Sequence, residues 1–167
     1  AAYGLADIAD FLDNGSYGHD AGTSLALLDD FNGDGWADLA VGDPALSEAG
    51  VDAGGVCVFF GPLAPATAYL AQADLCLHGE TAGDLAGHAI ASAGDFNGDG
   101  LTDLLVAAMY SDEADSNAGK VYVVYGSVGL TGEVSLSAAE VQITGDVALS
   151  YLGSAVAGIG DIDADGI

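Results

Sequence analysis

The side chains best suited to chemistry in this chain are aspartates that recur at a fixed spacing around glycine. Residues 30–38 read Asp-Phe-Asn-Gly-Asp-Gly-Trp-Ala-Asp, and residues 95–103 read Asp-Phe-Asn-Gly-Asp-Gly-Leu-Thr-Asp. A shorter copy, Asp-Ile-Asp-Ala-Asp-Gly-Ile, occupies residues 161–167. Calcium takes six to eight oxygen ligands from carboxylates, amides, carbonyls and water. The spacing therefore predicts loops that each bind one calcium ion.

In such a loop, side-chain oxygens at positions 1, 3 and 5 turn inward, position 7 offers its backbone carbonyl, and an aspartate at position 9 closes the cage. Glycine at position 6, here Gly35 and Gly100, allows a sharp turn that other residues adopt only with strain. The pattern predicts two complete sites and one partial site. The candidate ligands are Asp30, Asn32, Asp34, Trp36 and Asp38 in the first loop, Asp95, Asn97, Asp99, Leu101 and Asp103 in the second, and Asp161, Asp163, Asp165 and Ile167 in the third.

The first positions match an EF-hand, but the rest of the motif does not. An EF-hand needs a glutamate at position 12 and a helix on each side, whereas position 12 is Val41 in one loop and Val106 in the other. The flanking runs are short and apolar, which favours buried strands. Clusters of Asp, Asn and Gly also form ordinary turns; recurrence of the whole motif in register favours the metal loop.

The motif starts at residues 30, 95 and 161, so the chain repeats every 65 to 66 residues. Each full period holds four short strand-like runs separated by turn-rich segments. This pattern predicts an all-β fold of four-stranded antiparallel units that stack on one another, about two and a half repeats that do not close a ring. The expected strands are 23–28, 36–43, 55–60 and 73–78 in the first repeat, and 88–94, 101–109, 120–125 and 139–144 in the second.

Three further motifs keep step with the loops. Ala86-Gly87 and Leu152-Gly153 stand at equivalent places before two of the loops, and Val41-Gly42-Asp43-Pro44 follows the first loop. With the aspartate loops, they resemble the FG-GAP repeat family, the calcium-binding blades of the integrin alpha-subunit β-propeller and its bacterial relatives. The resemblance covers almost the whole chain and implies that the four-stranded units are propeller-type blades. It departs from the family pattern where alanine or leucine replaces the phenylalanine of "FG", and where Ala107-Ala108-Met109 replaces the second "GAP".

The phase of the repeat predicts four segments. We expect an outer strand of a preceding blade at residues 1–15, one blade at 16–79 with its loop at 30–38, a second blade at 80–145 with its loop at 95–103, and the first strand and partial loop of a further blade at 146–167. The third loop stops before its ninth position. We therefore expect a segment of a longer repeat protein, or a unit completed by a neighbouring chain.

Charge restricts the partners. The chain has 26 acidic residues against one basic residue, Lys120, and a formal net charge of −25. Phosphate binding needs Lys or Arg, so nucleic acid is excluded as a partner, and anionic membrane surfaces are equally poor partners. No stretch is long and apolar enough for membrane insertion.

The two cysteines, Cys57 and Cys76, lie on the expected third and fourth strands of the first blade, and both are replaced in the second blade. Adjacent antiparallel strands bring such positions within reach of a disulfide, which we predict; two buried thiols are the alternative. A disulfide and loops suited to millimolar calcium both favour an extracellular or cell-surface location.

No constellation typical of catalysis is present: the three histidines are scattered, no zinc spacing occurs, and no catalytic residue or organic cofactor is predicted. The resemblance implies a calcium-binding module for adhesion, with a protein or carbohydrate ligand meeting the end opposite the loops. Two alternatives stay open: end-to-end assembly into an extracellular fibre or surface layer through neighbouring repeats, and an accessory domain of a secreted enzyme.

Overall fold

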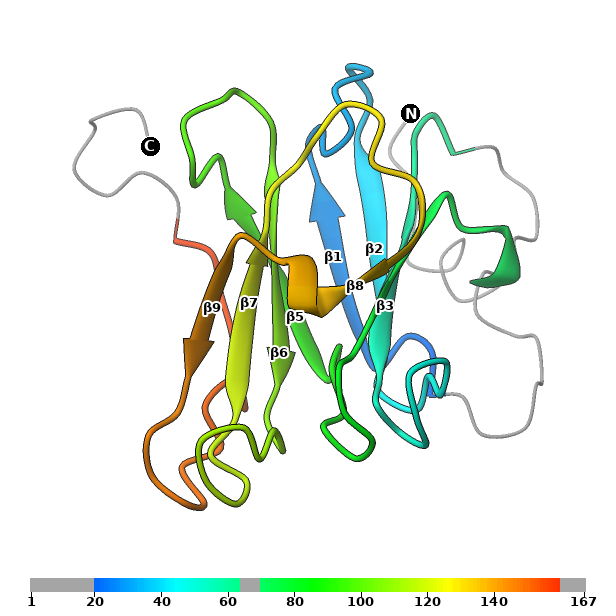
Figure 1. Ribbon diagram of the computed structural model, residues 1–167. Coiled ribbons are helices and arrows are strands. Elements are labelled where there is room, and N and C mark those ends of the chain that lie inside the picture. The colour runs from blue at the N-terminus through cyan, green and yellow to red at the C-terminus, as the bar shows by residue number, and fades with distance from the viewer. Residues whose placement is uncertain (1–19, 64–69, 160–167) are drawn as a thin grey trace.

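The computed structural model describes residues 20–63 and 70–159. Within them the chain forms nine strands in two sheets, and two single-turn 3-10 helices, η1 (Leu70–Gln72) and η2 (Leu136–Ala138) (Figure 1). No helix in these ranges has the length and apolar character needed to cross a bilayer. The N-terminal segment 1–15 and the third loop, 161–167, lie outside the described residues.

The first sheet follows the first repeat. It contains the antiparallel strands β1 (Ser24–Leu28), β2 (Asp38–Asp43), β3 (Gly55–Phe59) and β4 (Leu75–His78), each paired with its neighbour in sequence. A fifth strand, β8 (Gly132–Ser135), is added in parallel to the outer edge of β4. The sequence predicted no strand at β8, and this strand comes from the second repeat.

The second sheet repeats the arrangement with β5 (Ala89–Gly94), β6 (Asp103–Ala108), β7 (Lys120–Val124) and β9 (Val141–Thr144). All its pairs are antiparallel, in the order β5-β6-β7-β9. The eight predicted strands are all present, most of them a residue or two shorter than expected. The prediction of an all-β fold with four-stranded antiparallel units is confirmed, and the two sheets do not close a ring.

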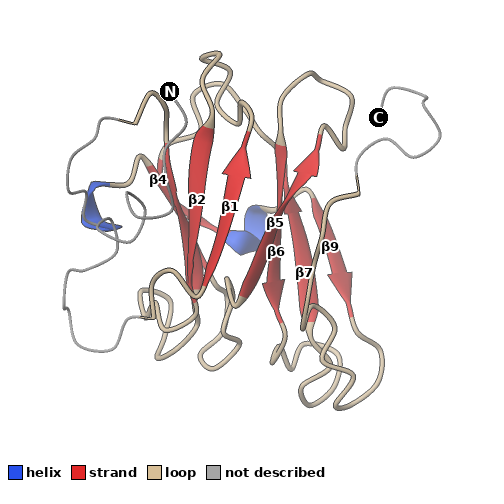
Figure 2. Cartoon of the chain, turned by 180° about the vertical axis from the view of Figure 1, so that it is seen from behind, coloured by secondary structure: helices blue, strands red, loops and turns tan. Residues whose placement is uncertain are grey.

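The sheets lie face to face, with the innermost strands β1 and β5 side by side (Figure 2). Strands β2, β3 and β7 are buried along their whole length, as expected for apolar strands covered on both faces. One continuous core fills the space between the sheets. Its main members are Leu28, Ala40, Val56, Val58, Leu75 and Leu77 from the first sheet, and Ile90, Leu104, Val106, Tyr122 and Val124 from the second.

A glycine fixes the close approach between the repeats. Gly87 has φ of +81°, and a Cβ at this position would lie 2.1 Å from the carbonyl oxygen of Gly55. Its own carbonyl accepts a hydrogen bond of 2.7 Å from the Ser24 hydroxyl of the first repeat. Because only glycine adopts this backbone without strain and leaves this space, the glycine of the repeat motif sets the distance between the sheets.

Candidate metal-binding loops

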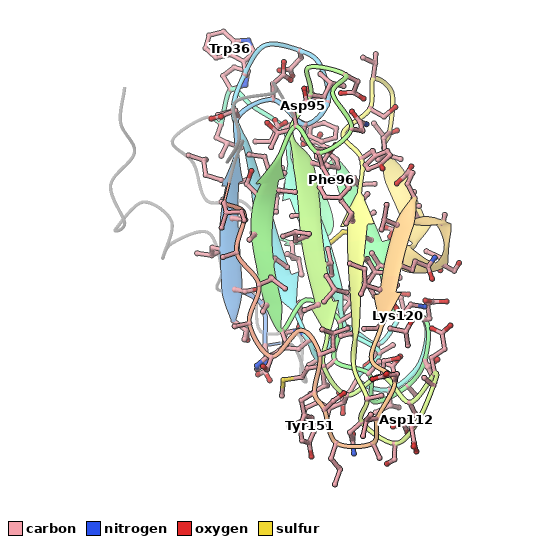
Figure 3. All side chains as sticks on the ribbon, turned by 90° about the vertical axis from the view of Figure 1, so that its left-hand side faces the viewer. Trp36, Asp95, Phe96, Asp112, Lys120 and Tyr151 are labelled. Carbon is pink, nitrogen blue, oxygen red and sulfur yellow. A yellow bond between two sulfur atoms is a disulfide. The ribbon has the colours of Figure 1, made fainter. Side chains whose placement is uncertain are left out.

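Both complete aspartate loops lie at the same end of the molecule. The first connects β1 to β2 and the second connects β5 to β6. Figure 3 shows Trp36 of one loop and Asp95 and Phe96 of the other at this end, with Lys120, Asp112 and Tyr151 at the opposite end. The antiparallel pairing places the loops together, because each joins the first two strands of its sheet on the same side.

In the first loop, the aspartate at position 1 organises the backbone. Asp30 Oδ1 accepts hydrogen bonds from the N–H groups of Gly33 (2.8 Å) and Asp34 (3.1 Å), and its Oδ2 accepts one from Gly35 (3.0 Å). Asn32 is bonded to Asp34 twice: its Oδ1 accepts from the Asp34 N–H at 3.0 Å, and its Nδ2 donates to Asp34 Oδ2 at 3.1 Å. The side chains at positions 1, 3 and 5 are therefore gathered on the inside of one turn.

The second loop has the same network, bond for bond. Asp95 accepts from the N–H groups at positions 4, 5 and 6, at 2.8, 3.0 and 2.8 Å. Asn97 accepts from the Asp99 N–H at 2.8 Å and donates to Asp99 Oδ2 at 2.9 Å. The residues at position 7, Trp36 and Leu101, donate their N–H groups to the aspartate at position 5. Two different sequence contexts thus fold into one loop geometry.

The aspartate at position 9 is the buried member of each set. Asp38 and Asp103 are both 0% exposed. Asp38 accepts from the N–H of Phe31 (2.8 Å) and of Gly61 (2.9 Å), and Asp103 makes the equivalent bonds with Phe96 and Gly126. These aspartates tie their loop to the end of the third strand of the same sheet.

Burial raises the pKa of Asp38 above its usual value, because desolvation disfavours the charged carboxylate; the two backbone hydrogen bonds lower the pKa, and the nearby charge of Asp34 raises it. The pKa of Asp103 is raised for the same reasons, with Asp99 as the unfavourable neighbour. Each loop therefore holds negative charge that a bound cation would stabilise.

The donor set suits calcium chemistry. Each complete loop offers three carboxylates and one amide oxygen around a single turn, and hard oxygen ligands of this kind bind calcium. Within the described ranges, no three His, Cys, Asp or Glu side chains stand close enough together to form a metal centre by themselves. The side-chain oxygens instead accept N–H groups of the loop, and each carboxylate oxygen retains a further lone pair. The ligand roles, including those of the carbonyls of Trp36 and Leu101, stay predictions.

The first loop is also bonded to the second repeat. The N–H of Thr102 donates to the Asp30 carbonyl at 2.8 Å, and the N–H of Asp30 donates to the Thr102 hydroxyl at 3.4 Å. The loop backbone at Gly33 lies close to the side chain of Val128. A change in the shape of this loop would therefore alter the contacts at the boundary between the repeats.

A polar cluster that the sequence did not predict lies at the opposite end of the molecule. Lys120, the only basic residue, is 2% exposed. Its Nζ donates to Glu80 Oε1 at 2.8 Å and to Glu113 Oε2. The hydroxyl of Tyr122 donates to the same oxygen of Glu80 at 2.9 Å, and the ammonium lies 5.0 Å from the centre of the Tyr122 ring. The signal that could have found it is a lone lysine beginning an otherwise apolar strand.

This cluster joins the two repeats. Glu80 follows β4 of the first sheet, whereas Lys120 and Tyr122 belong to β7 of the second. The two glutamates raise the pKa of Lys120 against the opposing effect of burial, and hydrogen bonds from Lys120 and Tyr122 lower the pKa of Glu80 against its desolvation. The charged forms of both groups are therefore favoured.

Cys57 and Cys76 face each other across β3 and β4 as paired residues. Their Cα atoms are 4.1 Å apart and their sulfur atoms are bonded to each other. This disulfide links the outer two antiparallel strands of the first repeat; the equivalent pair in the second repeat is Tyr122 and Gln142.

Comparison with known proteins places these loops in a family. The sequence profile of the FG-GAP repeat matches residues 21–59 and 86–124. Integrin alpha-3 of Cricetulus griseus is 39% identical over 108 residues, 65% of this chain and 10% of that protein. Integrin alpha pat-2 of Caenorhabditis briggsae is 31% identical over 164 residues, 90% of this chain and 13% of that protein. Integrin alpha-IIb of Homo sapiens is 39% identical over 92 residues, 54% of this chain and 9% of that protein.

The chain thus spans about a tenth of the length of these relatives. Each matched FG-GAP segment begins just before the first strand of a sheet, contains one aspartate loop, and ends at or beside the end of the third strand. The chain carries two FG-GAP repeats of the integrin alpha type and is a member of the FG-GAP repeat family.

Proposed function

We propose that this chain is a calcium-stabilised, extracellular module for adhesion or ligand binding. The observation that carries the proposal is the identical geometry of the two aspartate loops, each with a fully buried aspartate at position 9. Oxygen ligands at this spacing bind calcium in proteins. The integrin alpha relatives support a role in adhesion at the cell surface.

Calcium has two effects in this proposal. It compensates the negative charge gathered in each loop, and it fixes the shape of the loops, the first of which is hydrogen-bonded to the second repeat. A ligand that binds only the folded state stabilises it by about 2.7 kcal/mol at one hundred times its dissociation constant. Two such sites would therefore contribute a large share of the total stability of a domain of this size.

The proposed ligand surface is the end opposite the loops. It is formed by the connections between second and third strands and between successive repeats, which Figure 3 shows around Asp112 and Tyr151. Tyr110 and Tyr151 pack edge to face there, with ring centres 5.7 Å apart. A rigid aromatic pair beside acidic residues suits a protein or carbohydrate ligand.

The test is calorimetric titration of the intact chain with calcium, together with melting in calcium and in chelator. Asp34→Ala and Asp99→Ala should each remove one binding event and reduce the calcium-dependent rise in melting temperature. Asp115→Ala, which removes an exposed carboxylate outside the loops, is the matched control and should leave both unchanged. Melting that is the same in calcium and chelator for the parent chain would refute the proposal.

A further inference from the structure

The connection between β7 and β9 does more than join two strands of the second repeat. It crosses to the first sheet, where β8 pairs in parallel with β4 (Figure 1, yellow to orange). The register sets Cys76 opposite Glu133 and Leu77 opposite Val134. The pairing begins with the N–H of Gly132 donating to the Asp74 carbonyl at 2.8 Å.

Side chains hold this crossing segment in place. Glu133 Oε2 contacts His78 Nε2 across the two strands. Immediately after β8, Leu136 is 1% exposed and belongs to the core between the sheets. Its turn, η2, is capped by Ser135, whose hydroxyl accepts from the Ser137 N–H. The second repeat thus covers the outer edge of the first with one short strand and one apolar anchor.

Strand β9 occupies in the second sheet the place that β4 occupies in the first. Val56 pairs with Leu77 on β4, and the equivalent Val121 pairs with Ile143 on β9. Leu77 is 1% exposed, whereas Ile143 is 51% exposed. Among the described strands, β9 pairs only with β7. Within residues 20–63 and 70–159, no strand covers its outer edge as β8 covers that of β4.

The chain leaves β9 along the same path by which it leaves β4. The N–H of Gly79 donates to the Gly54 carbonyl at 2.8 Å, and the N–H of Gly145 donates to the Gly119 carbonyl at 2.8 Å. Parallel bridges follow at equivalent places, Gly54 with Ala86 and Gly119 with Leu152. After the second bridge, residues 155–159 form no strand. The backbone contacts that position the second repeat against the first therefore recur at the end of the second repeat.

We propose that the outer edge of β9 is the docking site for the β8-type segment of another FG-GAP repeat. The segment is added in parallel, in the register of β4 and β8, so that Gln142 stands opposite the position of Glu133. The occupant is an extended segment of four residues, equivalent to Gly132–Ser135, followed directly by an apolar residue equivalent to Leu136. Continuity with the β4–β8 interface is the reason for this choice of partner, because the same junction delivers the next repeat to the same side.

This assignment concerns how repeats join, and it goes beyond calcium binding. In it, each repeat uses the connection between its third and fourth strands to close the edge of the repeat before it. Exposed strand edges invite uncontrolled pairing with other chains, so a segment that closes each edge in turn also protects an array of repeats from aggregation.

The test uses a chain extended by one repeat, with a second copy of residues 80–145 placed directly after Gly145. Gln142→Cys is combined with Glu133→Cys in the appended copy; neither competes with native thiols, because Cys57 and Cys76 are bonded to each other. Under a glutathione buffer, mass spectrometry should find these two sites cross-linked. The matched control replaces Gln142→Cys by Asp115→Cys, an exposed position in the connection between β6 and β7 and away from the edge of β9, and cross-linking should fall about tenfold or more.

A second measurement does not depend on folding of the extension. The unextended chain with Gln142→Cys is incubated with a synthetic peptide of residues 130–140 carrying Glu133→Cys, against the same Asp115→Cys control. Preferential cross-linking at the Gln142→Cys site in either format supports the proposal. Equal capture by the two sites in both formats, or capture by neither, overturns it. Calcium titration of the same variants keeps this outcome separate from the proposed metal binding.

Discussion

Asp84 gives the sharpest test of the electrostatics of this chain. It lies in the connection between β4 and β5, at the boundary between the repeats, and is 5% exposed. Its N–H donates to the Thr81 carbonyl at 3.2 Å, and its own carbonyl accepts from Tyr110 at 3.4 Å. Desolvation by burial raises the pKa of its carboxyl group from 3.8 to about 6, against a hydrogen bond from Ser111 that lowers it. The nearby charges of Asp112 and Glu80 raise the pKa further, and that of Lys120 lowers it.

The direction of the pH dependence follows from this shift. The folded state binds the Asp84 proton more tightly than the unfolded state, so it gains stability from this group as the pH falls through 6 towards 3.8. Above pH 6 the carboxylate is charged in both states, and the folded state carries the full penalty. A rise from 3.8 to about 6 corresponds to about 3 kcal/mol, at about 1.4 kcal/mol per pKa unit.

We therefore expect Asp84→Asn, which keeps a polar side chain of the same size without the charge, to stabilise the chain by up to about 3 kcal/mol near pH 7.5. The gain should shrink as the pH falls and vanish near pH 4. Urea unfolding at a series of pH values, at fixed free calcium, measures the difference between the two chains. Asp146→Asn, an exposed carboxylate, is the control and should change stability by less than about 0.5 kcal/mol. A difference for Asp84→Asn that does not vary with pH would refute the reasoning.

Two further perturbations have definite expected outcomes. Lys120→Met should destabilise the chain by about 3 kcal/mol, because it leaves Glu80 without its buried partner. Adding Glu80→Gln to this variant should restore part of the lost stability in urea unfolding. If the effects of the two single substitutions simply added, the two side chains would not be coupled. Replacing both Cys57 and Cys76 by alanine should lower the free energy of unfolding by about 3 kcal/mol, because the unfolded chain gains conformational freedom without the cross-link. Denaturation of that variant against the parent checks this, and an unchanged midpoint would mean that the bond does not contribute to stability.

The order of strands in each sheet was predictable because the same pattern of apolar runs and aspartate loops occurs twice in the sequence. An apolar run such as Leu104-Leu105-Val106 is ambiguous alone, but its recurrence after the same aspartate loop fixes it as the second strand of a unit. The strand ends were less predictable. The run expected from Leu101 begins as a strand only at Asp103, since Leu101 and Thr102 belong to the loop closed by that aspartate.

Strand β8 could not have been predicted from local sequence. Gly132-Glu133-Val134-Ser135 is short, largely polar and bounded by turn residues. Its partner β4 lies more than fifty residues earlier in the chain, and the two strands belong to different repeats. A strand of this kind is determined by the edge it covers, since β4 presents unpaired backbone groups at that place. Periodicity within one repeat carries no information about pairing between repeats.

The loops show the same division between local and distant causes. The spacing of Asp30, Asn32 and Asp34 is sufficient to predict a turn with three inward side chains, because those contacts are made within six residues. The buried carboxylate of Asp38 accepts a hydrogen bond from the N–H of Gly61, which lies just after β3 and more than twenty residues beyond the loop. The loop sequence alone predicts oxygen ligands; their pKa values depend on the fold around them.

The boundary between the repeats is held by hydrogen bonds of the loop backbone at one end, by an ion pair at the other end, and by apolar side chains along its middle. At the loop end, Asp30 is bonded to Thr102 of the second repeat. At the opposite end, Lys120 joins Glu80 to β7, and between them the core of the two sheets is continuous. Removing the proposed calcium would relax only the loop end, since the lysine cluster needs no metal. We therefore expect chelation to raise hydrogen exchange at the amides of Phe31, Gly33 and Thr102 while exchange at Gly119 and Tyr122 stays slow. Equal loss of protection at both ends would show that the repeats separate as one unit, and the two ends of the boundary would then be energetically coupled through the core.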